Sequence, residues 1–332
     1  MALLELRDLR VAFRTREGVV RAVNDVSLSL DRGRTMGLVG ESGSGKTVTA
    51  LTILGLSRSE QTEVAGEVLL DGVDLLKLPE SELRGIRGRR VAMVFQDPLS
   101  SLHPMHRVGW QIAEAIRAHE RVSKKAARAR AIELIRGVGI PSPDARADAY
   151  PHELSGGMRQ RVMIAMALAL GPDLLIADEP TSALDVTVQS QILELLGRLQ
   201  RETGMALLLV SHDLGVIAEQ TDEVVVMYAG RVVEQGTRDE VIGAAIHPYT
   251  CGLLDSIPHV DGPRAAQLTP IPGSPPNAVN LPSGCAFHPR CAHALASCAE
   301  RIPLLSRVGP DHRVACPVMA PTGPLTVDEP RR

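Results

Sequence analysis

The feature that most restricts the fold is a glycine-rich octapeptide, Gly40-Glu41-Ser42-Gly43-Ser44-Gly45-Lys46-Thr47, between a short apolar segment and a segment of helical composition. It fits the phosphate-loop pattern of glycine, four residues, then Gly-Lys-Thr. The glycines let backbone N–H groups curl around phosphate oxygens, and the positive end of the following helix faces the anion. Lys46 adds charge at the β- and γ-phosphates, and Thr47 offers a hydroxyl to Mg²⁺. The sequence therefore predicts a nucleotide site whose members are Gly40, Ser42, Gly43, Ser44, Gly45, Lys46 and Thr47.

A second motif supplies the carboxylates that nucleotide hydrolysis needs. The apolar run 174–177 is followed directly by Asp178 and Glu179. We expect Asp178 to hold Mg²⁺ together with Thr47. Glu179 is the natural general base to align and polarise the attacking water.

Apolar segments of strand length alternate with segments of helical composition, which predicts an α/β domain with a largely parallel sheet. The expected strands include residues 36–39, 91–95, 174–177, 206–210 and 223–227. Aromatic residues make up only 2% of the chain, so the core must be aliphatic. The composition changes near His247 and becomes rich in proline and glycine, which predicts a boundary at about residue 245. We therefore expect residues 1–245 and 246–332 to form two units.

Charge and hydropathy exclude several classes of protein. The formal net charge is -3 and there is no long basic run, so nucleic-acid binding is not expected. The longest apolar run, near residues 162–170, is far shorter than the roughly 20 residues that span a bilayer. The first residues lack the pattern of a signal peptide. We expect a peripheral protein with no membrane span of its own.

One further motif, Leu154-Ser155-Gly156-Gly157-Met158-Arg159-Gln160-Arg161, resembles the signature sequence of ABC ATPases. The surrounding order is similar to that family as well. Gln96 resembles the Q-loop glutamine, residues 182–185 resemble the D-loop, and His212 resembles the switch histidine. The resemblance implies a P-loop NTPase fold of the ABC ATPase type, with a helical subdomain at about residues 97–153.

The resemblance also implies a mechanism in which two ATPase domains form a head-to-tail dimer around ATP and Mg²⁺. Ser155, Gly156 and Gly157 would contact the γ-phosphate held by the partner's phosphate loop. Gln96 would sense Mg²⁺ and the attacking water, and His212 would contact the γ-phosphate. Because the chain has one motif set, it needs a second ABC ATPase subunit.

Longer phrases are similar to the bacterial dipeptide and oligopeptide importers, a branch that also includes nickel importers. These phrases cover residues 96–102, 150–161 and 247–249. The resemblance implies an ATPase subunit that energises peptide import from the cytoplasmic face of the inner membrane. It also implies a related but different ATPase chain as partner, two membrane-embedded permease subunits and an extracytoplasmic solute-binding protein.

Four of the five cysteines, Cys285, Cys291, Cys298 and Cys316, lie in the last fifth of the chain. Four thiolates can hold Zn²⁺ or an iron–sulfur cluster. The spacing lacks the close pairs of most structural zinc sites, and similar cysteines in the dipeptide-importer branch imply a [4Fe–4S] cluster. Zinc and free thiols stay open as alternatives.

Three other functions compete with peptide import. A non-transport ABC ATPase usually carries two motif sets in one chain or a long insertion. An exporter ATPase is often fused to membrane spans. A third alternative is a redox sensor built on the cysteines, in which ATP hydrolysis is a secondary activity. It predicts redox-dependent behaviour but no assembly with membrane subunits.

Overall fold

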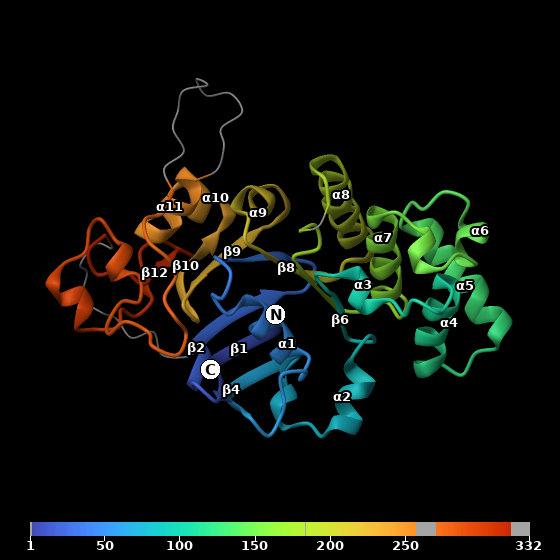
Figure 1. The fold of residues 1–332 in the computed structure, drawn as a ribbon, viewed down its shortest axis with the longest axis horizontal. Helices are drawn as coiled ribbons and strands as arrows, with labels where there is room; N and C mark the ends of the chain where they lie inside the picture. The colour runs from blue at the N-terminus through green and yellow to red at the C-terminus, as the bar shows by residue number, and fades with distance from the viewer. Residues whose placement is uncertain (1, 183, 257–269, 320–332) are drawn as a thin grey trace.

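The computed structural model describes residues 2–182, 184–256 and 270–319 and contains two sheets (Figure 1). The larger sheet is built from β3 Thr35–Val39, β6 Val91–Val94, β7 Leu174–Asp178, β8 Ala206–Ser211, β9 Glu223–Tyr228, β10 Arg231–Thr237, β11 Ser306–Arg307 and β12 Arg313–Val314. Its spatial order is β11-β12-β10-β9-β3-β8-β7-β6. The smaller sheet is built from β1 Ala2–Thr15, β2 Gly18–Asp31, β4 Thr62–Leu70 and β5 Val73–Asp74.

The centre of the larger sheet is parallel, which confirms the predicted α/β class. β3 pairs in parallel with β8 and β9, and β7 pairs in parallel with β6 and β8. In such a sheet the carboxyl ends of neighbouring strands meet at one edge, where ligands commonly bind. All the loops that carry the expected catalytic motifs leave the sheet at this edge.

Alternate residues of the central strands feed two separate hydrophobic cores. On β7, Leu174 and Ile176 pack on the side of the small sheet, whereas Leu175 and Ala177 pack on the opposite side. The small sheet covers the first face with helices α1 Lys46–Ile53 and α2 Glu80–Ile86. The second face is covered by α7 Gly156–Ala167, α8 Val186–Thr203 and α9 Leu214–Gln220. Burial on both faces explains why these strands are apolar throughout.

A helical lobe extends from the end of the sheet at β6 (Figure 1). It contains α3 Pro98–Ser101, α4 Val108–His119, α5 Lys124–Gly137 and α6 Pro143–Ala147. The helical composition expected for residues 110–138 belongs to two helices rather than one. Glu120 is extended, and Ser123 caps α5 by accepting a hydrogen bond from the backbone N–H of Ala126. A serine cap of this kind starts a new helix.

The C-terminal segment lies on the opposite side of the molecule from the helical lobe (Figure 1). It follows α10 Arg238–Gly243 and contains α11 Pro248–Asp255 and the short helices η3 His288–Arg290 and η4 Ala296–Ala299. β12 pairs with β10, so this segment extends the large sheet. The fully buried Glu234 accepts a hydrogen bond from Nε2 of His312 at 2.7 Å and further bonds from the backbone N–H groups of Ile246 and His247. The residues after about 245 are therefore anchored on the α/β core.

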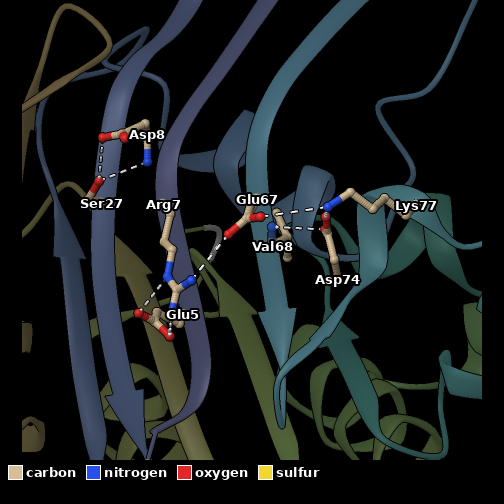
Figure 2. A network of polar contacts seen from close by, with 8 residues as sticks. All are labelled: Glu5, Arg7, Asp8, Ser27, Glu67, Val68, Asp74 and Lys77. Atoms are coloured by element: carbon tan, nitrogen blue, oxygen red, sulfur yellow. Dashed lines mark hydrogen bonds and ion pairs between the residues drawn. The ribbon is translucent and has the colours of Figure 1, made fainter. Parts of the chain in front are cut away.

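The exposed face of the small sheet carries a network of charged side chains (Figure 2). Arg7 on β1 donates to Glu5 at 2.9 Å and to Glu67 on β4 at 3.3 Å. Lys77 reaches Asp74 at 2.9 Å and Glu67 at 3.6 Å. Exposed ion pairs of this kind are screened by solvent and hold two long side chains in one geometry at an entropic cost. The network supports the pairing of β1 with β4 but contributes little to the free energy of folding.

Candidate functional site

The phosphate loop, residues 40–47, connects β3 to α1 and lies close against neighbouring backbone. A Cβ atom at Gly40 would lie 2.2 Å from the carbonyl oxygen of Met227, and one at Gly45 would lie 2.3 Å from that of Ala22. Gly45 also has φ +103°, where residues with a side chain are strained. Both positions therefore require glycine to hold the loop in this shape.

Two polar side chains of the loop, Ser44 and Lys46, are buried, whereas Ser42 and Thr47 are exposed. Nζ of Lys46 donates to the carbonyl oxygens of Gly40 at 2.6 Å and Glu41 at 3.1 Å. Burial lowers the pKa of Lys46, while nearby carboxylates oppose this effect. Ser44 is 4% exposed, and its hydroxyl has no hydrogen-bond partner among the described residues. A buried hydroxyl without a partner fits a ligand such as a phosphate group.

Asp178, the last residue of β7, faces the loop. Its Oδ1 accepts a hydrogen bond from the Thr47 hydroxyl at 3.2 Å. Burial raises the pKa of Asp178, and its hydrogen bond with Thr47 partly opposes this shift. A divalent cation between the two side chains would favour the ionised carboxylate, because a nearby positive charge stabilises it. The carboxylate and hydroxyl oxygens match the ligands that Mg²⁺ prefers.

Three side chains meet at the ends of the adjacent strands β6, β7 and β8. Nε2 of Gln96 donates to Oε2 of Glu179 at 2.9 Å. Nδ1 of His212 lies 3.1 Å from Oε1 of the same carboxylate. Glu179 itself has φ +44°, an uncommon conformation for a residue with a side chain and one often found at active sites. The structure thus brings together the three residues expected to be catalytic.

The residues of the signature motif lie at the N-terminus of α7. Ser155 precedes α7 and is exposed, and its Oγ accepts a hydrogen bond from the backbone N–H of Met158 at 3.3 Å. Gly156 is exposed, and a Cβ at Gly157 would lie 2.7 Å from Cγ1 of Val188. The exposed N-terminus of α7 is available to a group from outside the chain.

The D-loop follows Glu179. The Ser182 hydroxyl donates to the carbonyl oxygen of Glu179 at 3.2 Å, and Asp185 caps α8 through the N–H of Val188. Ala183 lies outside the described residues. These contacts fix the backbone on both sides of the loop.

The four C-terminal cysteines line one small cavity of about 20 Å³, together with His247, Phe287 and His288. Burial raises the pKa of the Cys285 and Cys291 thiols, which favours their protonated form. The described residues contain no group of three or more His, Cys, Asp or Glu side chains placed to hold a metal ion. The expected [4Fe–4S] cluster therefore lacks support in this arrangement. The four thiols do not converge on one point as metal ligands do, and the cavity between them is about the size of a water molecule.

A larger groove of about 490 Å³ lies between the sheet and the helical lobe. Its lining is mainly apolar and comes from the end of α1, from β6, α4 and α7 and from the start of the Q-loop. The lining includes Leu54, Leu56, Met93, Phe95, Ala118, Met163, Met166 and Leu170. Phe95 and Leu56 are 36% and 46% exposed. Phe95, which lines the groove, directly precedes Gln96, so an occupant of the groove would lie close to the group of Gln96, Glu179 and His212.

Two residues near the site were missed by sequence reasoning. Arg290 and Tyr249 both contact Glu41 of the phosphate loop. Tyr249 belongs to the phrase 247–249 that is similar to the peptide importers, but nothing in the sequence linked Tyr249 or Arg290 to the phosphate loop, because both contacts depend on docking of the C-terminal segment. Within residues 2–182, 184–256 and 270–319, no helix is both long and apolar enough to cross a bilayer.

Comparison with known proteins gives two family matches. The model described as "ABC transporter" matches residues 23–182, and the model described as "Oligopeptide/dipeptide transporter, C-terminal region" matches residues 233–298. The oligopeptide transport ATP-binding protein OppD of Bacillus subtilis is 48% identical over 323 residues, covering 97% of this chain and 90% of that protein. A putative peptide import ATP-binding protein of Brucella melitensis is 50% identical, covering 95% and 96%.

Solved structures give the same fold. An ATP-binding cassette solved as a dimer in a post-hydrolysis state, bound to ADP and phosphate, matches with a TM-score of 0.64 and 29% identity. The match covers 71% of this chain and 98% of the cassette. The similarity therefore extends over the whole core and, among the sequence relatives, over the C-terminal segment as well.

Proposed function

The chain belongs to the ABC transporter family, in its oligopeptide and dipeptide branch, and on this basis we propose a role for each part of its site. It is an ATPase subunit that drives peptide import. The observation that carries this conclusion is the convergence of the phosphate loop, Asp178 and the Gln96–Glu179–His212 group at one sheet edge, in a chain similar to oligopeptide transport ATP-binding proteins over nearly its full length.

We assign ATP to the phosphate loop and the start of α1. Lys46 and the loop N–H groups bind the β- and γ-phosphates, and Ser44 offers its free hydroxyl to the same anion. Thr47, Asp178 and Gln96 hold Mg²⁺, which when bound spreads the charge of the phosphates. Glu179 orients the attacking water and accepts its proton, and His212 orients this carboxylate and the γ-phosphate.

A second ATPase subunit completes the site. Ser155, Gly156 and Gly157 contact the γ-phosphate held by the partner, because they lie at the N-terminus of α7, where Ser155 and Gly156 are exposed and a helix favours an anion. The similar cassette that is dimeric with ADP and phosphate bound supports a pairing of two ATPase chains. We propose that the partner is a related but different chain, so the pair is a heterodimer.

Two permease subunits dock on the pair of ATPase chains, and one of them inserts a short helix into the apolar groove of this chain at Leu56, Phe95 and Met163. An amphipathic helix fits such a groove by burying its apolar face. The chain then has three parts. Residues 1–245 form the ATPase domain, and within it residues 97–153 form the helical subdomain that binds the permease. Residues 246–332 form the extension typical of the peptide-importer branch. The assembly works at the cytoplasmic face of the inner membrane and receives peptide from an extracytoplasmic binding protein.

The groove can be tested with Leu56→Glu. A carboxylate buried against an apolar helix without a partner is costly, so we expect recovery of the permease subunits with this chain to fall at least tenfold. ATP binding should be unchanged. The matched control is Leu304→Glu, at a leucine of the C-terminal segment that is 74% exposed. Equal assembly of both variants would contradict the assignment of the groove.

The cysteine cavity supports a second, separate proposal. Because Cys285, Cys291, Cys298 and Cys316 line one cavity, we propose that they bind an iron–sulfur cluster, with zinc and free thiols as the alternatives. The test is the iron, sulfide and zinc content of the anaerobically purified chain, with Cys298→Ser as the control. Matching iron and sulfide are expected. Zinc alone, or no metal, would overturn the cluster and leave the ATPase assignment intact.

A further inference from the structure

A buried ion pair joins the cysteine-rich segment to the phosphate loop. Nη1 and Nη2 of Arg290 donate to the two carboxylate oxygens of Glu41, at 2.7 and 3.0 Å. The Arg290 side chain is only 6% exposed and that of Glu41 is 25% exposed. Nε of Arg290 donates to the carbonyl oxygen of Pro272 at 2.8 Å, so the guanidinium is held on two sides. Buried charges persist where they are paired and hydrogen-bonded in this way.

A second contact from the same segment holds the backbone of Glu41. The hydroxyl of Tyr249, on α11, accepts a hydrogen bond from the Glu41 N–H at 2.7 Å. Tyr249 is fully buried and packs against the rings of Tyr228 and Phe287, with centroids 4.6 and 5.4 Å apart. Arg290 also donates to the Tyr228 hydroxyl at 3.3 Å. Glu41 is thus fixed through its side chain and its main chain at once.

The segment fixed in this way, Gly40 and Glu41, also binds the side chain of Lys46. The carbonyl oxygens of Gly40 and Glu41 accept the hydrogen bonds of Lys46 Nζ. A shift of Glu41 would move these carbonyls and with them the ammonium group that meets the phosphates. A displacement of about 1 Å at a group that binds charge can change a rate or an affinity severely.

We propose that Arg290 is a positioning residue for ATP binding: from the C-terminal segment it fixes the phosphate loop through Glu41, and so places Lys46. This inference rests on the proposed ATP site at residues 40–47. It gives the C-terminal segment a direct part in the nucleotide site, distinct from anything its cysteines bind. Arg290→Lys keeps the charge but loses the two-pronged geometry, so the position requires arginine.

A purely structural role for Arg290 would look different. The pair of His312 with Glu234, at 2.7 Å and buried on both sides, also attaches the C-terminal segment to the core. That pair joins β10 and does not touch residues 40–47. It therefore serves as a matched control for loosening of the segment.

The experiment compares Arg290→Met, Arg290→Lys and His312→Gln in the complete transporter. We expect Arg290→Met to raise the KM for ATP about tenfold, within the range typical of coupling between neighbouring sites, while kcat changes by less than about twofold. Arg290→Lys should give an intermediate KM. His312→Gln should lower the melting temperature without changing the KM. Arg290→Met combined with Glu41→Gln should be no worse than Arg290→Met alone, because the two residues act as a unit.

Two outcomes would overturn the inference. One is an unchanged KM in Arg290→Met, and the other is an equal rise in His312→Gln, which would assign the effect to loosening of the segment. Lys46→Ala, measured by binding of a fluorescent ATP analogue, separates the inference from the site on which it rests. Loss of binding in Lys46→Ala with an unchanged KM in Arg290→Met would reject the inference alone, whereas unchanged binding in Lys46→Ala would reject the proposed site and the inference with it.

Discussion

Glu179→Gln is expected to lower ATP hydrolysis at this chain's own site by about 10²- to 10⁴-fold, the usual contribution of a general base. The amide keeps the size of the side chain and can still pair with Gln96 and His212, which lie 2.9 and 3.1 Å from the carboxylate oxygens. It cannot accept the proton of the attacking water. ATP should therefore bind normally and stay unhydrolysed, which traps the closed dimer.

The measurement for Glu179 is the single-turnover conversion of labelled ATP to ADP in the assembled transporter, beside equilibrium binding of ATP. Glu194→Gln, on the exposed face of α8, is the control for the loss of one carboxylate. The control should hydrolyse ATP at the normal rate. A Glu179→Gln transporter with near-normal turnover would remove Glu179 from the role of base.

Ser155→Asp is expected to lower hydrolysis at the partner's site by about 100-fold, the effect typical of losing one preorganised donor to a charged group. Aspartate is as good a helix cap as serine, so α7 should keep its stability. Its negative charge, however, would face the γ-phosphate held by the partner and repel it. ATP binding to this chain's own phosphate loop should not change.

The control for this position is Ser155→Asn, which also caps a helix but carries no charge. It should show a much smaller loss of hydrolysis. Nucleotide binding at each of the two loops, measured separately, distinguishes the sites. A loss confined to this chain's own nucleotide would contradict the arrangement in which the signature serves the partner.

The sequence predicts the central sheet and the residues that lie at its edge, because both depend on local patterns. Each buried strand is an apolar run, and Glu179 follows one of these runs directly, whereas Gln96 and His212 were identified through the resemblance to ABC ATPases. Thr47 and Asp178 were both expected to serve Mg²⁺, and the structure places their side-chain oxygens 3.2 Å apart.

Contacts that depend on docking could not be predicted. The pairing of β12 with β10 uses two residues, Arg313 and Val314, which is too short a strand to give a period. Arg290 meets Glu41 across 249 positions of sequence, and neither residue carries a motif for the other. For the cysteines, the sequence predicted more than the structure contains. Their number suggested a metal cluster, but spacing alone could not tell whether the four thiols converge as ligands of one metal centre. Here they line one cavity without converging in this way.

The central claim is that this chain couples ATP hydrolysis to the movement of peptide, and uptake of a labelled oligopeptide by vesicles containing the complete transporter tests it most directly. The account predicts uptake that requires ATP on the side of this chain and that stops with Glu179→Gln, while Glu194→Gln transports normally. Peptide uptake that continues without ATP or with Glu179→Gln, or ATP hydrolysis that moves no peptide in the complete assembly, would contradict it.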